Sequence, residues 1–208
     1  MDTLRKDTVI TIMRALSELM QENKQYLIEL DSVMGDGDLG LTMERAFGAG
    51  YAEIANDADT DIGKLLMKAG LAMARVAPST MGTLVATGFM RGGKALAGKG
   101  EISAADLTAF FQAFVGGIME RGKAKPGEKT IIDSMHPAAE ALAAAGDIDI
   151  RTAMEKALEA AEVGLEASKE MVARHGRVAY YGEQSKGKQD PGATVGVLIF
   201  RGFCSIWN

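Results

Sequence analysis

The chain has 208 residues, of which 47% are hydrophobic and 25% are charged, and we expect a single domain over residues 1–208 with a hydrophobic core. The formal net charge of −5 without a basic stripe argues against a nucleic-acid partner. One cysteine, Cys204, excludes an internal disulfide, and without a leader or a membrane-spanning stretch we expect a cytoplasmic protein with no membrane partner.

Apolar residues recur at spacings of three and four along most of the chain, which predicts amphipathic helices and no strands. In chain order, the predicted helices cover residues 2–30 with a bend near Asn23, then 41–55, 61–76, 82–97, 103–118, 130–145, 149–175 and 191–207. Ser103 and Asp106 resemble a capping box, and Asp190 followed by Pro191 is typical of a helix start. Pro137 should kink the sixth helix or delay its start.

Eight helices need seven connections, and short connections favour antiparallel neighbours, so alternate connections should meet at one end of an all-α fold. The second, fourth and sixth connections (56–60, 98–102 and 146–149) are short and carry no unusual cluster. The other four are rich in Gly, Asp, hydroxyl and basic residues, and they comprise 31–40, 77–82, 122–129 and 176–192. We therefore expect the functional site at their shared end.

The first of these connections holds Asp31, Asp36 and Asp38 among Gly35, Gly37 and Gly40. Like charges this close require a proton or a bound cation, and carboxylate oxygens suit Mg²⁺. A solvated acidic turn is the alternative, because Asp and Gly are common turn residues. The third carboxylate and the neighbouring loops favour the metal site.

Three familiar patterns are excluded. The glycines of the aspartate segment spell a dinucleotide fingerprint, but no strand precedes them and the intervening aspartates would repel a pyrophosphate. An EF-hand starting at Asp36 would need a glutamate where Phe47 stands. A Walker A motif ending at Lys94 would need Ser or Thr where Ala95 stands.

Two of the four connections lead into helix N-termini, at residues 79–82 and 190–194. Free amides and the helix dipole make such positions suitable for phosphate, although helix capping alone also explains these residues. Arg177 has a planar fork that fits phosphate, and the lysines nearby supply positive charge or form a solvated face: Lys123, Lys125, Lys129, Lys186 and Lys188. Metal-binding carboxylates together with phosphate-binding groups indicate phosphoryl transfer.

The segments 30–40, 61–63, 121–130 and 176–194 resemble, in order and spacing, the L subunit of dihydroxyacetone kinase (the DhaL family). The resemblance implies a closed barrel of eight antiparallel helices with a nucleotide at one rim. It also implies that ADP or ATP is bound through two Mg²⁺ ions. The phosphoryl group would pass to a small ketose held on a separate K-type subunit, and a phosphocarrier subunit is a further partner of some such systems.

Carried over by position, the resemblance implies that Asp31, Asp36 and Asp38 are the magnesium ligands and that Arg177 meets phosphate. Gly122 and Ile131 would flank the adenosine. The remaining implied nucleotide contacts are Leu39, Gly40, Leu41, Thr42, Ser79, Thr80, Met81, Gly82, Asp190, Pro191 and Gly192. Two departures from the family pattern, Leu39 in place of His and residues 78–82 in place of Gly-Gly-Ala-Ser-Gly, leave the phosphoryl donor and the substrate open.

The sequence therefore predicts a phosphotransferase subunit that binds Mg²⁺ and an adenine nucleotide and depends on a K-type partner for its ketose. The sequence leaves open whether the phosphoryl group comes from ATP or from phosphoenolpyruvate through a relay of carrier proteins. One alternative is a nucleotide-sensing scaffold that contacts a regulator without transferring phosphate. Another is a helical barrel with a structural cation.

Overall fold

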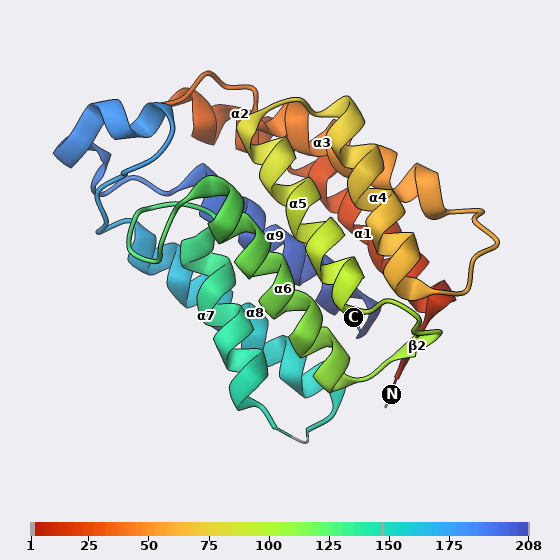
Figure 1. Cartoon of the computed structure of the whole chain (residues 1–208). Helices are drawn as coiled ribbons and strands as arrows, with labels where there is room; N and C mark the ends of the chain where they lie inside the picture. The colour runs from red at the N-terminus through yellow and green to blue at the C-terminus, as the bar shows by residue number, and fades with distance from the viewer. Residues whose placement is uncertain (1–2, 147, 208) are drawn as a thin grey trace.

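The computed structural model describes residues 3–146 and 148–207, and these residues are mostly helical (Figure 1). The α-helices are α1 (Lys6–Glu22), α2 (Lys24–Ser32), α3 (Leu39–Ile54), α4 (Ile62–Val76), α5 (Thr80–Ala95), α6 (Ala104–Gly122), α7 (Ile132–Ala144), α8 (Ile150–Ser168) and α9 (Pro191–Cys204). The shorter elements are the strands β1 (Leu4–Arg5) and β2 (Glu101–Ile102) and the 3₁₀ helices η1 (Arg177–Ser185) and η2 (Ser205–Trp207).

The two strands correct the prediction of a chain without strands. β1 pairs with β2 in antiparallel register, with Leu4 opposite Ile102. Both of these side chains are buried, so the pairing closes one end of the core. Two residues are too few to show an alternating pattern, which explains why the sequence did not reveal them. The first helix consequently begins at Lys6 and not at residue 2 or 3.

Local side-chain contacts set two helix boundaries. The predicted bend at Asn23 is a break between α1 and α2, where the Asn23 amide donates to the carbonyl of Leu19 at 2.8 Å. α5 begins at Thr80 and not at Gly82, because Ser79 Oγ accepts a hydrogen bond from the Gly82 N–H at 3.0 Å. This geometry makes Ser79 the N-cap.

α8 ends at Ser168, seven residues before the predicted end near His175. Ser168 Oγ donates to the Leu165 carbonyl at 2.7 Å, and the Lys129 ammonium donates to the Ser168 carbonyl at 2.6 Å. These bonds satisfy acceptors that a continuing helix would have used.

Pro137 lies inside α7 and does not set the start of that helix. Proline has no N–H, so Pro137 cannot donate the usual helical hydrogen bond to the carbonyl of Asp133. That carbonyl lies against Gly164 of α8. A Cβ atom on Gly164 would come within 2.1 Å of that carbonyl oxygen. A glycine at this position therefore allows α8 to pack closely on the proline-containing turn.

The helices pack around a core of phenylalanine side chains. Along the chain, α1 contacts α3, each helix from α3 to α8 contacts the next one, and α9 also contacts α1. The rings of Phe89 and Phe114 meet edge to face at 5.2 Å, and those of Phe111 and Phe200 stack at 4.5 Å. Burial of these large rings removes apolar surface from water and stabilises the fold.

Antiparallel packing brings four connections to one end of the molecule. In Figure 1, η1, the end of α2 and the loop between α6 and α7 lie together, while the paired strands β1 and β2 lie at the opposite end. None of the helices formed by the described residues is long and apolar enough to span a membrane.

Candidate functional site

A pocket of about 290 Å³ opens at the end where the four connections meet. Its volume is close to the lower limit for small-molecule sites. Residues from all four connections line it, as helix counting predicts. The predicted site residues in its wall are Asp31, Asp36, Asp38, Leu39, Ser79, Thr80, Met81, Ile131, Arg177, Asp190, Pro191 and Gly192.

The three aspartates form a compact cluster in this wall. Each offers one carboxylate oxygen, and these oxygens all lie within 4.8 Å of one another. The backbone makes this possible at Gly35, where a Cβ atom would come within 2.2 Å of Asp31 Oδ1. Gly37 has φ +71°, in the left-handed region that glycine tolerates best. The donor set is entirely carboxylate oxygen and therefore fits a hard divalent cation such as Mg²⁺.

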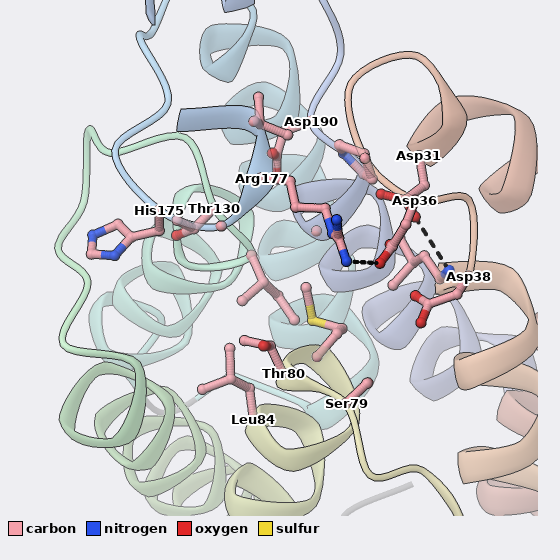
Figure 2. Close-up of a pocket in the computed structure, with 18 of the residues that line it drawn as sticks. Asp31, Asp36, Asp38, Ser79, Thr80, Leu84, Thr130, His175, Arg177 and Asp190 are labelled. Atoms are coloured by element: carbon pink, nitrogen blue, oxygen red, sulfur yellow. Dashed lines mark hydrogen bonds and ion pairs between the residues drawn. The ribbon is translucent and has the colours of Figure 1, made fainter. Parts of the chain in front are cut away.

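The electrostatics of the cluster also favour a cation. Burial raises the pKa of Asp31 above its ordinary value, and the negative charges of Asp36 and Asp38 raise it further. The guanidinium of Arg177 reaches across the pocket to Asp36, with Nη2 2.9 Å from Oδ2 (Figure 2). The acidic side of the pocket therefore already binds one positive group, the Arg177 guanidinium.

Two helices begin at the pocket, but their N-termini differ. Thr80 and Met81 are the first two residues of α5, and their amides have no acceptor within the helix. At α9, the buried carboxylate of Asp190 accepts the Ala193 N–H at 2.6 Å. Burial raises the pKa of Asp190 to about 7. Both helices are therefore capped, but the cap of α9 is a carboxylate, whereas the cap of α5 is the uncharged Ser79, so the first amides of α5 can receive an anion.

Five predicted nucleotide contacts lie outside the pocket wall, namely Gly40, Leu41, Thr42, Gly82 and Gly122. A Cβ atom on Gly40 would come within 2.1 Å of the Lys24 carbonyl oxygen, so this glycine allows close packing of α3 on α2. A Cβ atom on Gly122 would meet Leu84 at 3.2 Å, and Leu84 itself lines the pocket. Sequence position alone could not distinguish a residue that lines the pocket from one that only packs against the lining residues.

The pocket also contains residues that the sequence did not single out as site residues, including Leu84, Thr130, His175 and Val178. Thr130 and His175 are direct neighbours in sequence of Ile131 and Gly176, so the motifs pointed to their vicinity. Leu84 follows the start of α5 by one helical turn and lies two positions after the predicted contact Gly82, but in the sequence an apolar residue of a helix cannot be told from a core residue.

Lys129 lines the pocket but is not a free cation facing the aspartates. Its side chain is buried, and its ammonium donates to the carbonyls of Ser168 and Lys188, both at 2.6 Å. Burial lowers its pKa below the ordinary value. Backbone carbonyls at the end of α8 and shortly before α9 therefore accept hydrogen bonds from this ammonium, which corrects the prediction that Lys129 supplies charge beside the carboxylates or forms a solvated face. The other loop lysines, Lys123, Lys125, Lys186 and Lys188, lie outside the wall of this pocket.

The fold and the pocket together define a class of mostly helical protein in which a carboxylate cluster faces the start of a helix across one cavity. Comparison with known proteins identifies the family. A model of the DAK2 domain matches residues 33–205, and the chain belongs to this family. The resemblance found in the sequence is thereby confirmed.

Two bacterial relatives match the chain along most of its length. The PEP-dependent dihydroxyacetone kinase, ADP-binding subunit DhaL of Escherichia coli (strain K12) is 32% identical, and the match covers 92% of each chain. The ADP-binding subunit DhaL of PEP-dependent dihydroxyacetone kinase 1 from Listeria innocua is 33% identical over 95% of each chain. The L-erythrulose 1-kinase of Mycolicibacterium smegmatis is 33% identical over 93% of this chain, which corresponds to 34% of that larger protein.

The fold is also similar to a solved structure. The dihydroxyacetone kinase of C. freundii in complex with AMP-PNP and Mg²⁺ superposes with a TM-score of 0.74 at 22% sequence identity. The match covers 95% of this chain and 33% of that chain, so this chain corresponds to about a third of the solved protein.

Proposed function

We propose that the chain is the nucleotide-binding subunit of a dihydroxyacetone-type kinase, and that it binds ADP or ATP together with Mg²⁺. One observation carries the proposal: Asp31, Asp36 and Asp38 converge in the same pocket as the N-terminus of α5. Metal-binding oxygens beside phosphate-binding amides are what a metal–nucleotide complex requires. The two bacterial relatives are named as ADP-binding subunits, which supports the same ligand.

In this proposal, the three aspartates hold Mg²⁺, and the metal neutralises phosphate charge when it is bound. Mg²⁺ usually takes one or two protein carboxylates, so three of them support two ions. Arg177 and the amides of Thr80 and Met81 would bind phosphate oxygens. Phosphoryl transfer depends mainly on positioning and charge neutralisation, and these residues supply both.

The nucleoside would occupy the other side of the pocket, between Leu84 and Ile131. Both are apolar residues of the pocket wall, and Leu84 stands in front of the predicted contact Gly122. Apolar walls with a few polar groups are typical of ligand pockets.

We further propose that the phosphoryl group passes to a small ketose held on a separate K-type subunit. The two bacterial relatives are named as subunits, which supports a partner protein. The kinases to which they belong are named as PEP-dependent, which supports a relay that includes a phosphocarrier subunit. We also infer that the contact of α9 with α1 closes the helices into a barrel that forms one domain. A cytoplasmic location would agree with these metabolic partners.

The first test is binding of ADP by isothermal titration calorimetry with and without Mg²⁺. We expect Mg²⁺-dependent binding in the wild type and none in Asp36→Ala or Asp38→Ala, with unchanged helical circular dichroism. Asp59→Ala is the matched control, because Asp59 is an aspartate of another exposed loop outside the pocket. Unaltered ADP affinity in both site variants would reject the proposal.

The second test addresses transfer. Native mass spectrometry would show whether the purified protein retains ADP, as a relay subunit should, or has an empty site that accepts ATP. A K-type subunit and dihydroxyacetone would then be added with each donor, and ketose phosphate would be measured. Tight ADP binding without turnover would favour the nucleotide-sensing scaffold.

A further inference from the structure

Glu128 joins two loops at the side of the pocket opposite the aspartates. His175 Nε2 lies 2.7 Å from Glu128 Oε2, and the same oxygen accepts a hydrogen bond from the Lys125 N–H at 2.7 Å. The main-chain carbonyl of Glu128 accepts the Arg174 N–H at 3.1 Å. Glu128 thus ties the loop between α6 and α7 to the segment that follows α8.

The direction of the hydrogen bond between His175 and Glu128 follows from the charge of the carboxylate. The hydrogen bond from His175 lowers the pKa of Glu128 below its ordinary value, so the carboxylate is ionised at neutral pH. An ionised carboxylate only accepts hydrogen bonds, and therefore Nε2 of His175 carries the donating proton. In Figure 2, the His175 ring is directed away from Arg177 and the aspartates.

The position of His175 in the chain links this pair to the other side of the pocket. Only Gly176 separates it from Arg177, and Gly176 has φ +67° and ψ −163°, a conformation that suits glycine. Ala173 is also anchored, because its N–H donates to Ser185 Oγ at 3.0 Å. Arg177 therefore starts from an anchored backbone and reaches Asp36 at 2.9 Å.

We infer that Glu128 and His175 are positioning residues for Arg177, an inference that rests on the proposed function. Neither residue needs to touch phosphate. Their contact holds the start of the 176–185 segment so that the guanidinium lies over the acidic side of the pocket. An exposed arginine whose backbone is already ordered loses less entropy when it binds phosphate.

The test is a double-mutant cycle on the dissociation constant of ADP in the presence of Mg²⁺. We expect His175→Ala to weaken binding about tenfold, the scale of one hydrogen bond to a charged group. Arg177→Ala should weaken it at least as much, and the double variant should bind no more weakly than Arg177→Ala alone. This lack of additivity is expected only if His175 acts through Arg177.

Two further variants sharpen the result. His175→Gln keeps an N–H donor for Glu128 and should recover part of the lost affinity. His136→Ala is the matched control, since His136 is the other histidine and also pairs with a glutamate, Glu140 at 3.4 Å, but lies outside the pocket. It should bind ADP like the wild type.

Additive losses in the double variant would overturn the inference, as would a lowered melting temperature with unchanged ADP affinity in His175→Ala. A wild-type protein without ADP affinity is a different result, because it would reject the proposed function and this inference together.

Discussion

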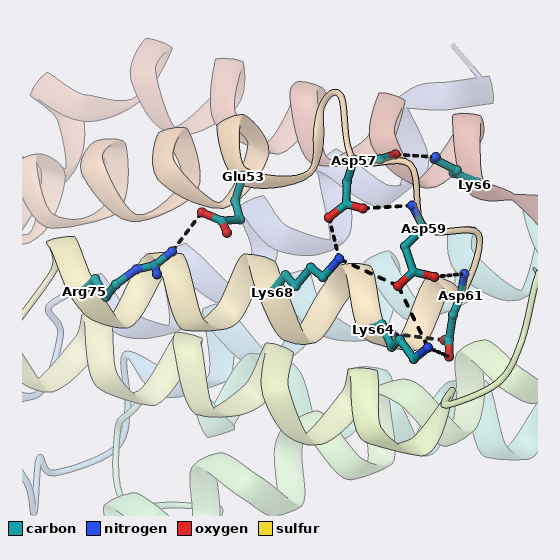
Figure 3. Close-up of polar contacts among 8 residues, drawn as sticks. All are labelled: Lys6, Glu53, Asp57, Asp59, Asp61, Lys64, Lys68 and Arg75. Carbon is teal, nitrogen blue, oxygen red and sulfur yellow. Dashed lines mark hydrogen bonds and ion pairs between the residues drawn. The ribbon is translucent and has the colours of Figure 1, made fainter.

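Two acidic segments of similar composition lie at the ends of successive helices, yet their surroundings are opposite. Asp36 and Asp38 follow α2, and Asp57, Asp59 and Asp61 follow α3, in each case at alternate positions. In the second segment, Lys68 Nζ lies 2.6 Å from Asp57 Oδ2 and 3.7 Å from Asp59 Oδ2 (Figure 3). From the sequence alone, we found no unusual cluster in this connection and did not predict these ion pairs.

The difference shows in the pKa values. The hydrogen bond from Lys68 lowers the pKa of Asp57, and the backbone N–H of Asp61 lowers that of Asp59. Burial and neighbouring carboxylates raise the pKa of Asp31. Aspartates that have their own lysines and turn amides need no metal, whereas aspartates that repel one another favour a cation. The pocket cluster also has a cation partner, Arg177 Nη2 at 2.9 Å from Asp36 Oδ2, so the raised pKa of Asp31 is what distinguishes this candidate metal site from the structural loop.

Among substitutions that leave all three acids in place, the largest effect should come from displacing one acid within the pocket cluster. In Gly35→Ala, the added Cβ would lie 2.2 Å from Asp31 Oδ1 and 2.7 Å from the Asp31 carbonyl oxygen, so both the carboxylate and the local backbone must shift. We expect the affinity for Mg²⁺ and ADP to fall about tenfold or more, by analogy with the loss of a charged contact, while the helical circular dichroism persists.

Gly100→Ala provides a control for the cost of adding a methyl group to a loop glycine. A Cβ atom there would meet only the Thr60 carbonyl at 3.9 Å. This variant should bind ADP normally. Equal binding by Gly35→Ala and the wild type would show that the close approach of Asp31 is not required.

A smaller effect is expected from removing the lysine of the second segment. Lys68→Met leaves Asp57 and Asp59 without their closest cation and should lower the melting temperature by a few degrees at most, because ion pairs that water still reaches contribute little. Lys64→Met should have less effect, since its contacts with Asp59 and Asp61 are 4.0 Å and 3.9 Å long. ADP affinity should be unchanged in both variants, and a loss would mean that the two segments are coupled.

The smallest effect should appear as a change in acid sensitivity. Because Lys68 lowers the pKa of folded Asp57 below the ordinary 3.8, ionised Asp57 stabilises the fold above that pH. The contribution is lost as the pH falls through the folded pKa. Asp57→Asn should therefore be less stable than the wild type at pH 6, and the difference should shrink in acid. A constant difference in melting temperature between pH 6 and pH 3 would contradict this.

Much of the molecule follows from the sequence because its causes are local. Apolar spacing predicts the helices, and short connections place Asp31, Arg177 and the start of α5 at one end. Ser103 and Asp106 form the predicted capping box, and Asp190 caps α9 as expected. Each of these features depends on residues within about one helical turn, or on the alternating direction of antiparallel helices.

The tertiary structure alone decides what those residues meet. The Lys129 ammonium donates to the carbonyl of Ser168 at the end of α8. The Glu128 carboxylate is hydrogen-bonded to His175, although 47 positions separate the two residues. Gly122 lies behind Leu84 and not in the pocket wall. The ionisation and exposure of a side chain depend on neighbours from other helices, and their distances are set only when the core packs.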